Sequence, residues 1–166
     1  MMFTIVAPAS LSTDSAISDW ALWDLPPMMF SSEKAFAFLQ DVSTRMMRRP
    51  ACREHSELVA LAFWLREANT RSMLKAYSQN IYKALGSVVH FTPANVDTMF
   101  IYSWVCSLLT GNKNVVRVSS RSGDVQTLVL AVLNEVFSLP EYQDIAKRNI
   151  FIQYQHDLSE GGQYTA

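Results

Sequence analysis

Charged side chains are scarce in this sequence of 166 residues. They make up 17% of the chain and hydrophobic residues make up 49%, whereas a free-standing soluble domain usually carries about 25% charged residues. A large core would account for the shortfall, and so would an apolar surface that meets a second subunit, a partner or further chain. The formal net charge is −1, so we expect no general attraction to nucleic acid or to an anionic membrane.

Cysteine is also scarce, and the signals of export are missing. Only Cys52 and Cys106 are present, which gives no disulfide framework and favours a reduced, cytoplasmic compartment. The N-terminus lacks the positively charged start of a signal peptide. No apolar run reaches the roughly 18 residues that a membrane span requires. The sequence also holds no internal repeat, and we expect no metal site.

The centre of the chain predicts a β-α-β unit. Ser87–Phe91 and Asn114–Val118 are short apolar runs typical of buried strands, and a long apolar helix is expected between them over Asn95–Thr110. Gly111 follows that helix and suits a left-handed stop. Two buried strands joined by a helix form a right-handed parallel unit.

The elements around this unit complete a fold prediction. We expect helices over residues 31–49, 54–68 and 70–82 before the unit, and helices over 124–139 and 141–148 and a buried strand over 149–154 after it. The fold class is therefore α/β: N-terminal helices followed by a β-α-β-α-β half of a Rossmann-like NAD(P)-binding domain, with a parallel sheet. The expected divisions are an extended arm (1–30) with a short strand at Phe3–Val6, a helical segment (31–84), the half-domain (85–158) and a polar tail (159–166).

Ligands of such open sheets bind at the carboxyl ends of the strands. Here these ends are Thr92–Asn95 and Arg117–Arg121, so both segments are candidates for a binding site.

The first helix carries signals at both of its ends. Ser31-Ser32-Glu33 predicts a start with a hydroxyl cap and an acid in the first turn. Arg45, Arg48 and Arg49 crowd the other end, where cations suit the helix dipole, and Pro50 is expected to stop the helix. The arginines could bind a phosphate or form a solvated helix end.

Several motifs, taken together, resemble one family. They are Phe30–Glu33, Phe38–Ser43 and Val59–Arg66 in the helical part, and Val89-His-Phe-Thr-Pro-Ala-Asn-Val96, Ser107-Leu-Leu-Thr-Gly-Asn-Lys-Asn-Val-Val-Arg-Val-Ser-Ser120 and Ile150–Tyr154 in the sheet part. Over about residues 30–157 the chain resembles the acyl-CoA reductases typified by the fatty-acid reductase of luminous bacteria (LuxC-like), a branch of the aldehyde dehydrogenase superfamily.

The resemblance implies an NADPH-dependent reduction of an acyl thioester, carried by CoA or by a protein, to an aldehyde. A cysteine thiolate attacks the thioester, and a hydride then releases the aldehyde. Asn95 matches the loop asparagine whose amide faces the developing oxyanion, although it also fits a helix N-cap. Thr92, Pro93 and Ala94 match the loop that passes under the cofactor.

The same resemblance implies a preference for NADP. Arg117 takes the place of the superfamily's usual lysine near the adenosine ribose, and no acid follows within three residues. An NAD site generally places a carboxylate on the ribose hydroxyl, whereas a 2′-phosphate needs arginine and hydroxyl donors. Arg117, Ser119, Ser120 and Arg121 supply such donors; a polar strand end without a ligand is the alternative.

Departures from the family shape the remaining expectations. The glycine-rich turn and the nucleophilic cysteine of the family do not occur in this sequence, and we expect Cys106 to be a small core residue. Asp97 stands where the family commonly has proline. We therefore expect an N-terminal portion of a reductase that is truncated before its catalytic domain, is oligomeric at full length and works with an acyl-transferring or synthetase partner.

Two alternatives remain at this point. The chain could be a non-catalytic interaction module that pairs with a separate catalytic chain. It could also belong to another superfamily branch, the acyl-phosphate reductases of proline synthesis, although the segment Phe63–Arg66 argues against that.

Overall fold

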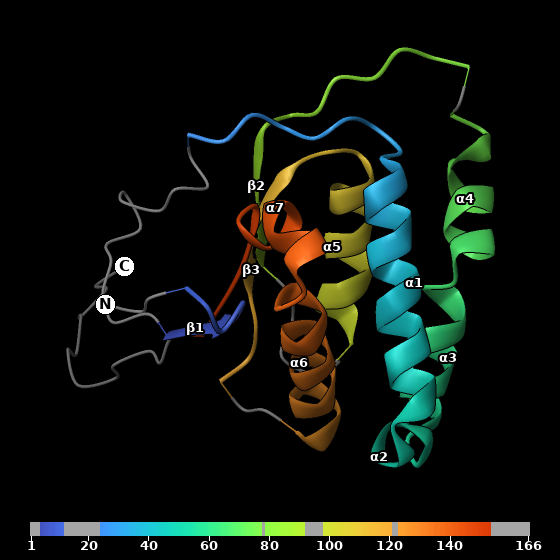
Figure 1. The fold of residues 1–166 in the computed structure, drawn as a ribbon, viewed down its shortest axis with the longest axis vertical. Coiled ribbons are helices and arrows are strands. Elements are labelled where there is room, and N and C mark those ends of the chain that lie inside the picture. The colour runs from blue at the N-terminus through green and yellow to red at the C-terminus, as the bar shows by residue number, and fades with distance from the viewer. Residues whose placement is uncertain (1–3, 12–23, 78, 92–97, 121–122, 154–166) are drawn as a thin grey trace, which may run out of the picture.

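The computed structural model describes residues 4–11, 24–77, 79–91, 98–120 and 123–153, which form an α/β fold around a four-stranded sheet (Figure 1). The strands are β1 (Thr4–Ala7), β2 (Ser87–Phe91), β3 (Lys113–Arg117) and β4 (Asn149–Gln153), in the spatial order β1-β4-β3-β2. The helices are α1 (Glu33–Arg48), α2 (Pro50–Arg53), α3 (Ser56–Trp64), α4 (Glu67–Lys75), α5 (Met99–Leu109), α6 (Asp124–Phe137) and α7 (Gln143–Ala146), with a 3₁₀ turn at Pro140–Tyr142.

β2, β3 and β4 run parallel to one another, as the sequence predicts. β2 pairs with β3 from Ser87↔Lys113 to Phe91↔Arg117, and β3 pairs with β4 in the same direction. The strands β4, β3 and β2, joined by α5 and α6, form a β-α-β-α-β unit with parallel strands. Their carboxyl ends therefore lie along a single edge.

The prediction of an entirely parallel sheet is wrong, because β1 pairs antiparallel with β4. The strand expected near residues 3–6 is present at Thr4–Ala7. It reaches the sheet before any helix of the chain, so no right-handed crossover fixes its direction. The side chain of Asn134 on α6 holds the end of β1 and the residues that follow, since its Nδ2 donates to the Val6 carbonyl (2.9 Å) and its Oδ1 accepts from the Ala9 N–H (2.8 Å).

The helices are stacked in layers on one side of the sheet. α5 and α6 lie nearest to the strands, α1 packs outside them, and α3 and α4 lie beyond α1 (Figure 1). Both crossovers move across the sheet in the same sense, so both of their helices fall on the same face.

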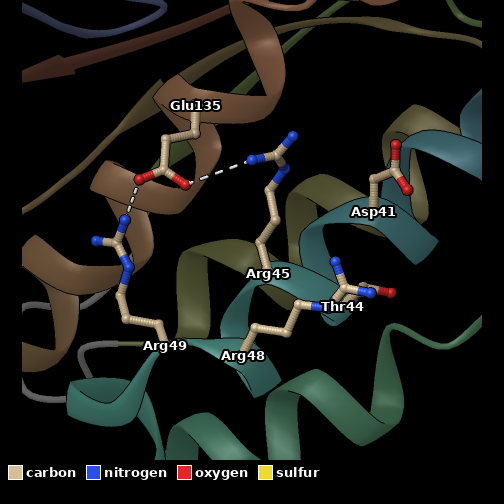
Figure 2. Close-up of a pocket in the computed structure, with 6 residues that line it drawn as sticks. All are labelled: Asp41, Thr44, Arg45, Arg48, Arg49 and Glu135. Atoms are coloured by element: carbon tan, nitrogen blue, oxygen red, sulfur yellow. Dashed lines mark hydrogen bonds and ion pairs between the residues drawn. The ribbon is translucent and has the colours of Figure 1, made fainter.

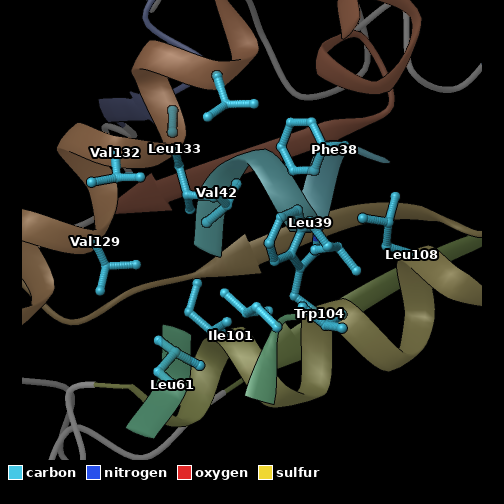
Figure 3. Close-up of a cluster of buried hydrophobic side chains, with 14 of the residues drawn as sticks. Phe38, Leu39, Val42, Leu61, Ile101, Trp104, Leu108, Val129, Val132 and Leu133 are labelled. Carbon is cyan, nitrogen blue, oxygen red and sulfur yellow. The ribbon is translucent and has the colours of Figure 1, made fainter. Parts of the chain in front are cut away.

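Aromatic rings fill the centre of these layers. The rings of Phe38 and Phe137 lie 5.1 Å apart, and those of Trp104 and Phe151 also lie 5.1 Å apart, so the cluster joins α1, α5, α6 and β4. Aliphatic side chains surround the rings (Figure 3). A second, smaller cluster of Val115, Ile150 and Ile152 occupies the opposite face of the sheet. β3 and β4 thus bury both faces, as parallel strands do.

The helical segment differs from prediction at its ends. α1 begins at Glu33 as expected, but the Ser32 side chain makes no capping hydrogen bond. Pro50 begins α2 instead of only stopping α1, which suits proline at a first helical position. α4 ends at Lys75 rather than near residue 82. Tyr77 and Ile81 keep the helical spacing but are exposed, so no packed face supports further turns there.

Gly111 adopts the left-handed conformation that the sequence predicts, with a φ of 85°. The segment before α1 lies against this turn. The Met28 N–H donates to the Gly111 carbonyl (2.8 Å), and the Ser31 N–H donates to the Leu109 carbonyl (2.9 Å). A Cβ at position 111 would lie 2.2 Å from the Met28 carbonyl oxygen. Only glycine therefore allows both the turn and the contact.

Candidate functional site

Arg117 lies at the carboxyl end of the central strand. It is the register partner of Phe91 on β2 and of Ile152 on β4. Side chains alternate along β3, and Val116 belongs to the core cluster beneath the helices. The Arg117 side chain therefore leaves the sheet on the face opposite α5 and α6. An arginine in this position could contact a ligand laid across the strand ends.

The turn after β3 is held by side-chain amides. The Ser119 carbonyl accepts hydrogen bonds from Gln126 on α6 (2.9 Å) and from Gln153 on β4 (2.8 Å). The Val118 N–H donates to the Ile152 carbonyl (2.9 Å). These bonds hold the backbone at Val118 and Ser119, and Ser120 is exposed.

α6 begins beside this turn with Gly123 as its N-cap. The first turn of a helix directs free N–H groups and a partial positive charge outward. An arginine, two hydroxyl groups and a helix N-terminus thus lie along one short stretch of chain. Such a set of donors suits a phosphate-bearing ligand.

The predicted site residues fall into two groups. Arg117 ends β3, and Ser119 and Ser120 follow it in the turn toward α6. Thr92, Pro93, Ala94, Asn95, Asp97 and Arg121 lie outside the described residues, so the predictions for them stand as they were made.

Neither cysteine has the setting of an attacking thiol. Cys52 is buried between α1 and α3, and burial raises the pKa of its thiol. The expectation that Cys106 is a core residue is wrong, because it lies on the outer side of α5 and is exposed. Partial burial nevertheless raises the pKa of Cys106. A raised pKa reduces the thiolate that nucleophilic attack requires.

A buried polar network under the sheet was not anticipated from the sequence. The His90 ring makes two hydrogen bonds. Its Nδ1 is bonded to the Ser103 hydroxyl, and its Nε2 is bonded to Asn114 Oδ1 (3.0 Å). The Asn114 amide donates to Asn149 Oδ1 (2.8 Å), which also accepts from Trp104 Nε1 (2.7 Å). The signal was available, since a histidine and two asparagines interrupt otherwise apolar strands.

Burial lowers the pKa of His90, and the hydrogen bond to Asn114 opposes this only in part. The neutral ring is therefore favoured at neutral pH. Because the Asn114 amide nitrogen donates to Asn149, its oxygen faces His90 and accepts the Nε2 proton. The network pins β2, β3 and β4 to α5 just below the site.

Other classes of site find no support among the residues that the structure describes. Within those ranges, no group of three or more His, Cys, Asp or Glu side chains could hold a metal ion. Within the same ranges, no helix is both long enough and apolar enough to cross a bilayer.

The chain matches a known protein family. The family model described as acyl-CoA reductase (LuxC) matches residues 9–156, which is most of the chain. No curated protein and no solved structure matches the chain.

Proposed function

Because the chain belongs to the LuxC family of acyl-CoA reductases, we propose that it forms the N-terminal, cofactor-binding part of an NADPH-dependent reductase that converts an acyl thioester to an aldehyde. The observation that carries this proposal is Arg117 at the shared carboxyl edge of β2, β3 and β4, next to Ser119 and Ser120. A bound NADPH would supply the hydride.

The residues of the edge take separate roles in this proposal. Arg117, Ser119, Ser120 and Arg121 bind the 2′-phosphate of the adenosine ribose, for which a guanidinium fork and hydroxyl donors are suited. Thr92, Pro93 and Ala94 run beside the cofactor. The Asn95 amide donates to the oxygen that becomes negative when hydride reaches the thioester carbonyl.

The attacking cysteine lies outside these 166 residues in this proposal. The raised pKa values of both thiols support that assignment. The two free cysteines also fit a reducing, cytoplasmic setting. The acyl group would arrive as a CoA thioester or from an acyl-transferring or synthetase partner, with the full-length enzyme an oligomer.

Cofactor titration tests the proposal. We expect the chain to bind NADPH more tightly than NADH, and Arg117→Gln to weaken NADPH binding about tenfold, or about 1.4 kcal/mol, with little change for NADH. Arg53→Gln removes the same charge from the exposed end of α2 and serves as the control. Thermal unfolding of each variant checks that the fold is kept. A preference for NADH, or equal loss of both nucleotides, would contradict the NADP assignment.

A second candidate function is a non-catalytic module that pairs with a separate catalytic chain. Phe91 on β2 is 73% exposed, and Val89 on the same strand is 49% exposed, so this strand presents apolar surface. The module is favoured if the chain binds neither nucleotide but co-purifies at fixed stoichiometry with a chain that carries the nucleophilic cysteine.

A further inference from the structure

Three arginines line a pocket of about 360 Å³ at the end of α1 (Figure 2). Arg45 and Arg48 lie on the last turn of α1, three residues apart and so on one face of the helix. Arg49 follows at the junction with α2. The lining is completed by Asp41, Thr44 and Glu135. The cofactor edge described above contributes none of these residues.

Glu135 neutralises two of the arginines at once. Its carboxylate pairs with Arg49 through one oxygen and with Arg45 through the other, the latter at 3.8 Å. Figure 2 shows the two guanidinium groups on either side of this carboxylate. The longer contact leaves Arg45 with donors to spare, because a guanidinium has five N–H groups.

Asp41 is already engaged elsewhere. It accepts a hydrogen bond from the Tyr142 hydroxyl at 2.9 Å. Burial, followed by this hydrogen bond and the charge of Asp41, raises the pKa of Tyr142 to about 12. The phenol therefore stays protonated and keeps its proton directed at Asp41.

Arg48 has no such partner. Within the described ranges no carboxylate pairs with it, and its side chain extends from the end of α1 toward Thr44 (Figure 2). The lining thus holds three cations and two carboxylates. Both carboxylates already have partners: Glu135 pairs with Arg45 and Arg49, and Asp41 accepts from the Tyr142 hydroxyl. The helix dipole favours positive charge at this end of α1, but it does not require three side chains to face one hollow.

We propose that this pocket binds a phosphate monoester. A dianionic tetrahedral phosphate offers three acceptor oxygens and matches several guanidinium forks at once. The volume lies within the range of small-molecule sites and leaves room for part of a ribose beside the phosphate. Arg48 makes the principal contact, Arg45 a second one, and Glu135 holds Arg45 and Arg49 in place.

Two ligands of the proposed reductase carry such a group: CoA on the 3′ position of its ribose and NADPH on the 2′ position. The choice of these two rests on the proposed function, whereas the phosphate chemistry rests only on the pocket. Adenosine 3′,5′-bisphosphate and inorganic phosphate therefore probe the pocket without assuming the reaction.

The test measures binding to the 166-residue chain by isothermal titration calorimetry. The probes are inorganic phosphate, adenosine 3′,5′-bisphosphate, CoA, dephospho-CoA and NADPH. The variants are Arg48→Gln and the control Arg53→Gln, an exposed arginine of α2 that does not line the pocket. Because Arg48 has no carboxylate partner, we expect the first variant to keep the melting temperature of the parent.

We expect Arg48→Gln to raise the Kd of adenosine 3′,5′-bisphosphate about tenfold, and Arg53→Gln to change it less than twofold. If Arg48→Gln weakens the binding of CoA in the same way but leaves dephospho-CoA unchanged, the phosphate bound by the pocket is the 3′-phosphate of CoA. If Arg48→Gln weakens the binding of NADPH alone, the phosphate bound by the pocket is the 2′-phosphate of NADPH. That phosphate would then bind at Arg48 and not at Arg117, as the proposed function has it.

Equal losses in the two variants, or unchanged binding of the bisphosphate, CoA and NADPH alike by Arg48→Gln, would overturn the inference and leave the proposed function intact. If the variant weakens the bisphosphate while CoA and NADPH do not bind the parent chain, the pocket stands and the proposed function fails.

Discussion

At the scale of single residues, the Asn149 side chain makes three hydrogen bonds inside the core. It is fully buried at the start of β4. Its oxygen accepts from Trp104 and Asn114, and its amide donates to the Ile145 carbonyl at 2.7 Å. One side chain thus joins α5, β3 and α7 to β4, which makes the layers depend on a hydrogen-bonding pattern as well as on apolar packing.

Replacing Asn149 by alanine should therefore be costly. The change leaves two buried N–H groups, Trp104 Nε1–H and one N–H of the Asn114 amide, without their acceptor, and each such group costs about 1–3 kcal/mol. We expect Asn149→Ala to lower the free energy of unfolding by about 2–4 kcal/mol in urea denaturation. Asn80→Ala, at an exposed position, should change it by less than about 0.5 kcal/mol. Equal effects of the two changes would contradict the role of the network.

His90 makes stability depend on pH. It is 7% exposed, and burial holds its pKa below the ordinary value of about 6.5 that it regains on unfolding. The unfolded chain therefore binds a proton that the native chain does not, so this contribution is complete above about pH 6.5 and is lost as the pH falls through that value.

We expect the free energy of unfolding to decrease between pH 7.5 and pH 5.5, and His90→Gln to flatten that decrease. Urea titrations at a series of pH values measure it. His55→Gln alters a histidine outside the buried network and should keep the slope of the parent. A slope that is the same in the parent and in His90→Gln would exclude His90 as its source.

At the scale of elements, the turn between α5 and β3 couples the N-terminal arm to the sheet. Gly111→Ala adds strain at a φ of 85° and places a Cβ against the Met28 carbonyl. A left-handed residue other than glycine costs about 1–2 kcal/mol, and the displaced arm adds to that loss.

We expect Gly111→Ala to destabilise the chain by more than about 2 kcal/mol and to speed amide exchange at Met28 and Ser31, which donate to this turn. Gly86→Ala is the matched control, because Gly86 also has a positive φ but no atom lies within 4 Å of an added Cβ. The difference between the two variants measures the contact with the arm, and a difference near zero would mean that the arm adds nothing.

The elements that the sequence predicts well are those whose signal is local. β2, β3, β4 and α6 come from apolar runs bounded by glycine or polar residues, and the stop at Gly111 comes from a single residue. The direction of β1 depends on pairing with β4 at the other end of the chain, which no local pattern carries. The end of α4 was missed because helical spacing says nothing about whether a neighbour covers the face.

The candidate site divides in the same way. Arg117, Ser119 and Ser120 were located by motif, and the β3–α6 turn brings them together. The amide bonds from Gln126 and Gln153 that hold this turn were not foreseen. They join residues from three elements, and such contacts emerge only once the sheet is assembled.

At the scale of the whole molecule, the scarcity of charge has two causes. The core clusters are large for a chain of this length, and exposed apolar side chains gather along β2 and the segment leading to it, namely Ile81, Leu85, Val89 and Phe91. Among the described strands, β2 pairs only with β3, so these side chains lie beside a strand edge. An exposed apolar edge strand is a site of association.

We therefore expect the isolated chain to self-associate with rising concentration, and Phe91→Lys to reduce that association. Phe91 is 73% exposed, so the change removes no core packing and should leave the melting temperature within a few degrees. Sedimentation velocity over a range of concentrations measures the effect. Phe63→Lys makes the same change of charge at a 43% exposed position on α3. Equal reductions would assign the effect to net charge, whereas a reduction only with Phe91→Lys assigns it to the edge of the sheet.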